Sequence, residues 1–140
     1  MKPKIIIVDD HQTFRQGLKD LINIENIGEV IGEASDGAQF LDLLTSHSPD
    51  LILMDIDMNQ MNGIETTQKA LQKAPNLKVI ALTMFENEEY LYKMIDVGAT
   101  GFLLKSSHIN ELEKAIKLVV SGEKYFSFSL PGRNMINFGR

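Results

Sequence analysis

Residues 51–55 read Leu51-Ile52-Leu53-Met54-Asp55, four apolar side chains followed directly by a carboxylate. A hydrophobic run this short, without helical spacing, is typical of a strand that is buried on both faces of a parallel sheet. We therefore expect this strand to be the central one. Asp55 would then lie at its carboxyl end.

Three further apolar runs end in a polar side chain in the same way. Residues 5–8 precede Asp9 and Asp10, residues 79–82 precede Thr83, and residues 102–104 precede Lys105. The carboxyl ends of parallel strands meet at one edge of a sheet, where open α/β proteins bind their ligands. The sequence therefore predicts that three carboxylates, a hydroxyl and an ammonium group gather at one edge.

Segments with helical spacing alternate with the strand-like runs, including a run around Val30-Ile31. The expected helices cover about 11–24, 37–47, 63–74, 88–97 and 111–120, and Gly98 and Gly122 are the expected stops of the last two. This alternation predicts an α/β fold with a doubly wound parallel sheet of five strands and five helices. The side chain of Asp36 is expected to cap the second helix, and that of Asp10 the first.

One domain accounts for the chain, because 140 residues bury a single core. The apolar periodicity is lost from Tyr125 onward, so we place the end of the domain at residue 129 and interpret 130–140 as a linker or a trimmed end. The 14 basic and 19 acidic residues give a formal net charge of −5, which argues against a free-standing nucleic-acid binder.

Cysteine is absent, which excludes thiolate metal sites and disulfides and is compatible with a cytoplasmic protein. No apolar stretch has the length of a membrane span or of a signal-peptide core, so no membrane partner is expected. His11, His47 and His108 are distant from one another in sequence, and we expect no metal role for them; His11 is interpreted as a surface residue at a helix start.

The predicted cluster has the parts needed to hold a divalent metal and a phosphoryl group. A strand-end carboxylate such as Asp55 can attack a phosphoryl group if a metal and a cation neutralise the incoming charge. Aspartate oxygens suit Mg²⁺, with Asp9 and Asp10 as ligands. Without a cation, each pair of carboxylates about 5 Å apart would repel by roughly 3 kcal/mol at an effective dielectric constant of about 20.

The chain resembles the receiver domain of bacterial two-component response regulators over about Lys4 to Ser129. The resemblance rests on Val8-Asp9-Asp10, Met54-Asp55-Ile56, Asn62-Gly63, Ala81-Leu82-Thr83 and Phe102-Leu103-Leu104-Lys105. It implies a flavodoxin-like strand order of 2-1-3-4-5. It also implies a phosphorylation-activated switch rather than an enzyme, apart from self-catalysed phosphoryl acceptance and slow autodephosphorylation.

By the same resemblance, Asp55 accepts phosphate from a sensor histidine kinase, and Mg²⁺ is bound by Asp9, Asp10, Asp55 and the backbone carbonyl of Asp57. Lys105 and Thr83 would bind the phosphate, and Thr83 and Phe102 would form a switch pair in which Phe102 turns inward. Asp57 and Phe85, each two positions past a site residue, are expected to modulate the dephosphorylation rate.

Two departures from the family pattern are Met58-Asn59, where Met-Pro is common, and Ser106, where proline often follows a cis bond after the lysine.

A finer resemblance, to the NarL/FixJ (LuxR-type) subfamily, rests on residues 96–105 and on residues 116–122 followed by Tyr125. Members of this subfamily bind DNA through a C-terminal helix-turn-helix domain, which these 140 residues do not hold. Whether the chain is a fragment or a stand-alone receiver, and whether it forms a homodimer, stays open at this point. So do the cognate kinase, the stimulus, the output domain and its genes.

Two other functions compete with the phosphorylation switch. A receiver fold can act as an unphosphorylated dimerisation module. Alternatively, Asp55-Ile56-Asp57 matches the Asp-x-Asp signature of phosphohydrolases of the haloacid dehalogenase type. The order of motifs along the chain argues against the hydrolase, because those enzymes place Asp-x-Asp first and their acidic pair last.

Overall fold

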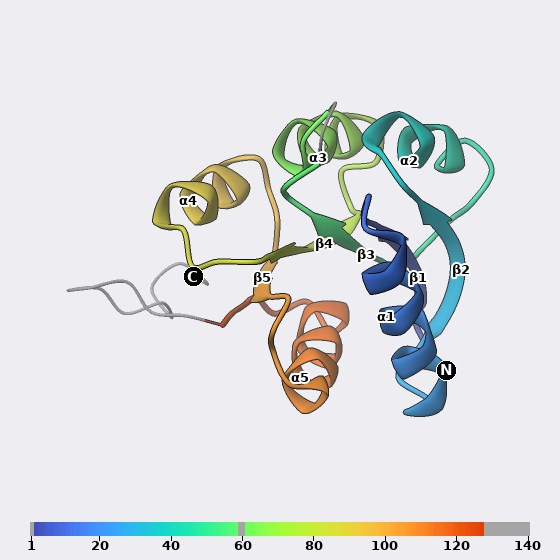
Figure 1. Ribbon diagram of the computed structural model, residues 1–140. Coiled ribbons are helices and arrows are strands. Elements are labelled where there is room, and N and C mark those ends of the chain that lie inside the picture. Colours follow the sequence, from blue (N-terminus) through green and yellow to red (C-terminus); the bar gives the residue numbers. More distant parts are fainter. Residues whose placement is uncertain (1, 59–60, 128–140) are drawn as a thin grey trace.

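The computed structural model describes residues 2–58 and 61–127, which form a parallel sheet covered by helices on both faces (Figure 1). Within these residues the sheet has six strands in the order β2-β1-β3-β4-β5-β6, and neighbouring strands are parallel. The strands are β1 (Lys4–Val8), β2 (Glu29–Ala34), β3 (Leu51–Asp55), β4 (Lys78–Thr83), β5 (Gly101–Leu104) and β6 (Tyr125–Phe126). The predicted α/β fold and the order 2-1-3-4-5 are confirmed, with β6 added at the edge beside β5.

Five helices of the described chain connect the strands and form two layers. They are α1 (Gln12–Ile24), α2 (Gly37–Leu43), α3 (Gly63–Lys73), α4 (Glu88–Asp96) and α5 (Ile109–Val120). Figure 1 shows α1 and α5 on one face of the sheet and α2, α3 and α4 on the other. Each layer encloses its own hydrophobic cluster, as expected for right-handed crossovers between parallel strands.

The strand quoted first in the sequence, β3, lies between β1 and β4, and all five of its residues are buried. Its side chains alternate between the two cores, as the pleat of a strand requires. Ile52 and Met54 pack toward α2, α3 and α4, whereas Leu51 and Leu53 pack toward α1 and α5. Burial on both faces explains why the run is continuously apolar and why the chain becomes polar only at Asp55.

Helix termini agree with most of the predicted caps, with one correction. The Asp36 side chain accepts a hydrogen bond from the backbone N–H of Gln39, as expected. Asp10 does not cap α1: the N-cap position is His11, and no side chain caps this helix. Asp10 lies one residue too early, in the turn after β1. Gly98 (φ 106°) and Gly122 (φ 102°) adopt the left-handed conformation just after α4 and α5, which confirms them as stops.

Two predicted boundaries differ from the structure. Helix α2 ends at Leu43, a few residues before the expected stop at Ser48-Pro49, because residues 44–46 continue as turns. Helix α5 begins at Ile109 rather than Glu111, because His108 supplies the cap by accepting a hydrogen bond from the Asn110 N–H. Both shifts lie at helix ends and leave the core faces of the helices unchanged.

The segment that begins at Tyr125 is more ordered than its sequence suggested. The backbone N–H of Tyr125 donates to the Thr100 carbonyl and that of Ser127 to the Phe102 carbonyl, both on or beside β5. The Tyr125 hydroxyl donates to the Glu111 carboxylate at 2.8 Å, and burial together with this carboxylate raises the pKa of Tyr125 to about 12. Strand β6 therefore belongs to the domain. The predicted linker, residues 130–140, lies outside the described residues.

No helix in the part of the chain that the structure describes combines the length and apolar character needed to cross a bilayer.

Gly63, the first residue of α3, leads to a stability prediction because it packs against the end of β3. A methyl group added there would overlap the carbonyl oxygen of Asp55 and approach the Cα of Ile56, and backbone atoms of a central strand cannot move aside. We expect Gly63→Ala to lower the free energy of unfolding by about 1–3 kcal/mol, as measured by urea denaturation.

Gly17 in α1 is the matched control, since a methyl group there meets nothing within 4 Å. Gly17→Ala should raise stability by about 0.5–1 kcal/mol through helix propensity. Equal effects of the two substitutions would contradict the packing role of Gly63.

Candidate functional site

Asp55 is almost completely buried at the end of β3, with 1% of its surface exposed. Its Oδ1 accepts a hydrogen bond from the backbone N–H of Asp57 at 3.2 Å and lies 3.3 Å from the Lys105 ammonium. Its Oδ2 is buried and has no hydrogen-bond partner among the described residues. A buried carboxylate oxygen without a partner is costly, so this site is suited to a further cation or to a covalent group.

Lys105 joins two of the predicted carboxylates. Its ammonium nitrogen lies 2.8 Å from Asp9 Oδ2 and 3.3 Å from Asp55 Oδ1, and 4% of its side chain is exposed. The Phe14 ring lies below the same nitrogen, 4.7 Å from it to the centroid, and adds a cation–π contact. The backbone N–H of Lys105 donates to the Thr83 carbonyl of β4 at 2.7 Å, which fixes the backbone position from which this side chain extends.

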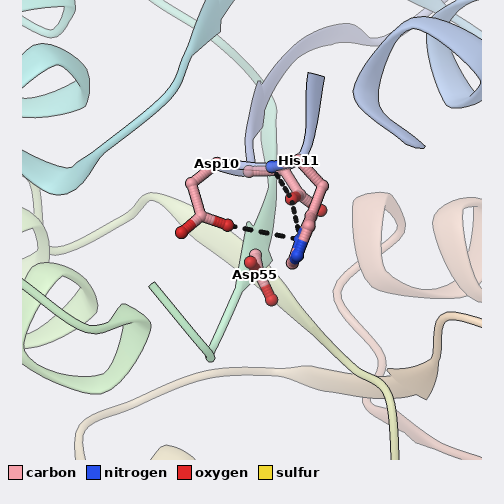
Figure 2. Close-up of side chains that lie close together, drawn as sticks. Asp10, His11 and Asp55 are labelled. Carbon is pink, nitrogen blue, oxygen red and sulfur yellow. Dashed lines mark hydrogen bonds and ion pairs between the residues drawn. The ribbon is translucent and has the colours of Figure 1, made fainter. Parts of the chain in front are cut away.

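The turn after β1 brings Asp9, Asp10 and His11 into one group with Asp55. Figure 2 shows Asp10 and His11 next to Asp55. Asp9 Oδ1 accepts the backbone N–H of His11 at 2.8 Å, which closes the turn. The His11 Nδ1 then lies 3.3 Å from Asp9 Oδ1 and 3.3 Å from Asp10 Oδ1. Arg15, one turn into α1, donates to the Asp9 carbonyl and pairs with Glu33 on β2, which holds the turn against the sheet.

One potential ligand atom from each of Asp9, Asp10, His11 and Asp55 lies within 4.8 Å of the others. The acidic donors and the unpartnered Asp55 Oδ2 fit a hard divalent cation such as Mg²⁺, which prefers carboxylate oxygens and water. The three predicted carboxylates therefore converge as expected. His11 is the N-cap of α1 and its side chain is 61% exposed, which agrees with a surface residue at a helix start. That its ring also lies within the cluster was not predicted, because the direction of the ring depends on the turn.

Burial and the neighbouring carboxylate of Asp9 raise the pKa of Asp55 from its ordinary value near 3.8 to about 7. The Lys105 ammonium and the Asp57 N–H act in the opposite direction but do not cancel this effect. Asp55 is therefore poised between protonated and ionised forms at neutral pH. An added cation would favour the ionised form, which is the one that can act as a nucleophile.

The other predicted residues occupy two environments. Thr83 is buried at the end of β4, and Phe102 is fully buried in the cluster that contains Leu91 and Met94. Phe102 therefore faces inward. Asp57 and Phe85 are exposed, Phe85 by 74%. The role of the Asp57 carbonyl stays a prediction.

The described residues contain no cis peptide bond, so Lys105–Ser106 is trans; Asn59 lies outside the described residues.

Comparison with known proteins assigns the family. The family model described as the response regulator receiver domain matches residues 5–117. The chain belongs to this family. The receiver resemblance read from Asp9, Asp10, Asp55, Thr83 and Lys105 is thereby confirmed.

The most informative relatives support the NarL/FixJ subfamily. The transcriptional regulatory protein DegU of Brevibacillus brevis is 39% identical over 124 residues, covering 89% of this chain and 52% of the relative. LiaR of Bacillus subtilis (strain 168) is 37% identical over 130 residues, covering 93% and 62%. The chain thus spans little more than half the length of these curated relatives. They are named as regulators and not as enzymes, in agreement with the prediction for this receiver.

Solved structures agree. A LuxR-family two-component response regulator from Aurantimonas sp. SI85-9A1 superposes with a TM-score of 0.85 at 30% identity, covering 89% of each chain. The isolated receiver domain of RcsB from Salmonella enterica serovar Typhimurium, solved with the phosphomimetic BeF₃⁻, gives a TM-score of 0.81 at 25% identity over 91% of this chain and 94% of that one.

The raised pKa of Asp55 leads to a stability prediction. In the folded protein the Asp55 carboxyl stays protonated up to a pH of about 7, whereas in the unfolded chain it loses its proton near pH 3.8. The free energy of unfolding therefore falls as the pH rises between these two values. Asp55→Asn removes the buried charge. In a chelator-containing buffer at pH 8 we expect it to raise the free energy of unfolding by about 2 kcal/mol, with a smaller gain at pH 5.

The exposed Asp42 on α2 provides the control, since Asp42→Asn should change stability little at either pH. Denaturant curves at the two pH values measure the effect. A gain for Asp55→Asn that is the same at pH 5 and pH 8 would contradict the electrostatic cause.

Proposed function

We propose that this receiver is a phosphorylation-activated switch in which the Asp55 carboxylate accepts a phosphoryl group. The observation that carries the proposal is the buried Asp55 carboxylate. Its Oδ2 has no hydrogen-bond partner among the described residues, its Oδ1 lies 3.3 Å from the Lys105 ammonium, and the acidic pair Asp9 and Asp10 lies close by. The pKa of the Asp55 carboxyl is raised by its burial and by the charge of Asp9. The Lys105 ammonium can donate hydrogen bonds to phosphate oxygens.

A bound Mg²⁺ would be held by Asp9, Asp10, Asp55 and the Asp57 carbonyl, and it would offset the charge on the acidic cluster and on a transferring phosphoryl group. The chain's own residues do the remaining work. Asp55 forms the acyl phosphate, and its Oδ1 stays oriented by the Asp57 N–H. Lys105 stays in the cluster through Asp9, so its charge is available beside the new phosphate.

Thr83 and Phe102 are proposed as the parts that respond. Thr83 ends the strand next to β3, so its hydroxyl can hydrogen-bond a phosphate oxygen. Phe102 occupies the inward position, and we propose that a phosphate on Asp55 stabilises this arrangement through Thr83. A change from 1:99 to 99:1 between two states needs about 5.5 kcal/mol of differential stabilisation, which a doubly charged group near Lys105 and a metal can supply.

Partners of the whole protein are proposed from the relatives. Two-component receivers pair with sensor histidine kinases, so we propose such a kinase as the phosphate donor and the cytoplasm as the location. DegU and LiaR are named as transcriptional regulatory proteins. If this receiver belongs to a protein of that length, DNA would be bound through a C-terminal helix-turn-helix domain outside these 140 residues. Homodimer formation is a further proposal without a defined face.

Intact-mass analysis after incubation with acetyl phosphate tests the switch chemistry. We expect one phosphoryl group per native chain when Mg²⁺ is present and none when it is chelated, because the acidic cluster repels the donor. Asp55→Asn should take up none, whereas the exposed-residue control Asp42→Asn should be phosphorylated like the native chain.

Persistent labelling of Asp55→Asn would reject the proposed acceptor. No adduct on the native protein, with unchanged self-association in Asp55→Asn, would favour the dimerisation module instead. Sustained release of phosphate from a small ester, at many turnovers per chain, would favour the hydrolase.

The exposed side chains of Asp57 and Phe85 are predicted to set the lifetime of the phosphorylated state, because both are free to contact the attacking water. We expect Asp57→Ala and Phe85→Ala each to change the dephosphorylation half-life by about two-fold or more, a small difference in barrier height. The exposed control Glu65→Ala on α3 should leave it unchanged. Half-lives identical to native in both variants would reject this role.

A further inference from the structure

The imidazole of His11 lies inside the acidic cluster rather than beside it. Its Nδ1 is 3.3 Å from Asp9 Oδ1 and 3.3 Å from Asp10 Oδ1. Together with Asp9, Asp10 and Asp55, His11 offers one of four potential ligand atoms that lie within 4.8 Å of one another. Figure 2 shows the Asp10 and His11 side chains converging on the same space next to Asp55. The nitrogen thus lies next to two carboxylate oxygens.

These separations are close to those of ligands that share one ion. With bonds of about 2.1 Å, neighbouring ligands of an octahedral ion are about 3 Å apart and opposite ligands about 4.2 Å apart. The two 3.3 Å distances of His11 Nδ1 are near the separation of neighbouring positions, whereas the 4.8 Å spread of the four atoms is about 0.6 Å wider than opposite ligands of one ion allow. Small side-chain rotations would bring all four atoms into range of one ion.

A second observation points independently to a bound cation. Asp55 is 1% exposed, and its Oδ2 has no hydrogen-bond partner within the described part of the chain, although it belongs to the same cluster. Lys105 supplies one positive charge for Asp9 and Asp55, but its contacts use Asp9 Oδ2 and Asp55 Oδ1. Asp10 Oδ1, like Asp55 Oδ2, is buried and has no hydrogen-bond partner among the described residues, so both oxygens are available to another ion.

We propose that His11 is a metal ligand of this receiver, so that the site has one nitrogen donor and discriminates among divalent ions differently from a site of oxygens alone. Imidazole nitrogen suits Co²⁺, Zn²⁺ and similar transition-metal ions, whereas Mg²⁺ gains little from it. The His11 side chain is 61% exposed, so the opposite ring nitrogen can donate its proton to water while Nδ1 binds the ion. The inference rests on the proposed metal site at Asp9, Asp10 and Asp55.

The test compares how substitutions of His11 change the affinity of the site for two metal ions. Co²⁺ and Mg²⁺ dissociation constants are measured by calorimetry on the native 140-residue chain and on His11→Ala and His11→Asn. We expect both variants to lose at least about ten-fold in Co²⁺ affinity and less than about three-fold in Mg²⁺ affinity. Asparagine places an oxygen near the Nδ1 position, so it separates loss of the nitrogen from loss of the side chain.

His108 provides a matched control, because it is also an exposed histidine at a helix N-cap but is not among the residues that could hold the ion. His108→Ala should bind both ions like the native chain. A direct readout is the ring nitrogen spectrum of ¹⁵N-histidine-labelled protein with Zn²⁺. One Nδ1 resonance, absent in His11→Ala, should move to a metal-bound chemical shift.

Asp10→Asn distinguishes failure of this inference from failure of the proposed function. If Asp10→Asn loses Mg²⁺ binding while His11→Ala changes Co²⁺ and Mg²⁺ affinity equally, the site stands and the ligand role of His11 is overturned. Tighter Mg²⁺ binding in His11→Ala would also overturn it, by showing that the ring competes with the ion. If Asp10→Asn binds Mg²⁺ like the native chain, the proposed metal site itself fails and this inference fails with it.

Discussion

Electrostatic repulsion between buried carboxylates is the constraint on which the rest of this site depends. Asp9 and Asp55 are each 1% exposed and share a single ammonium group, that of Lys105. Burial and the Asp9 charge raise the pKa of Asp55 to about 7 despite that lysine. Such a cluster is costly in the folded protein unless a cation joins it. The same repulsion makes the cluster sensitive to a bound metal ion or phosphoryl group, since any added charge changes the electrostatic energy of the site.

The parallel sheet keeps these carboxylates close together despite their repulsion. Strand β3 is anchored by β1 and β4 and by side chains in both cores, so the end of the strand cannot move to separate the charges. Gly63 allows α3 to begin directly against the Asp55 carbonyl, which limits movement from the other side. Rigid backbone at β3 thus holds a side chain in an environment that its chemistry alone would disfavour.

Strand β5 connects the acidic cluster to the last described segment. Lys105 follows its end, and Phe102 lies within it. The Phe102 carbonyl accepts the N–H of Ser127, so β6 is bonded to the strand that carries the predicted switch residue. A displacement of β5 would therefore act directly on the backbone at residue 127. Strand β5 thus links Ser127 to Lys105 and, through the Lys105 ammonium, to Asp55.

The amino-acid sequence alone determined the sheet, its central strand and the convergence of Asp9, Asp10, Asp55, Thr83 and Lys105. These features follow from hydrophobic period and from the rule that parallel strands end at one edge, both of which are local or topological. Stops such as Gly98 were also readable, because a left-handed residue after a helix favours glycine.

Only the tertiary structure decided the remaining features, because they depend on distances between segments far apart in the sequence. The two-residue strand β6 is too short to show a period and exists through its pairing with β5. The inward position of Phe102 depends on the helices around it, and the ring of His11 is directed by a turn that Asp9 closes. The raised pKa of Asp55 needs both its burial and the position of Asp9. Hydrophobic pattern fixes which segments form the core, whereas side-chain direction and charge coupling arise only when those segments pack.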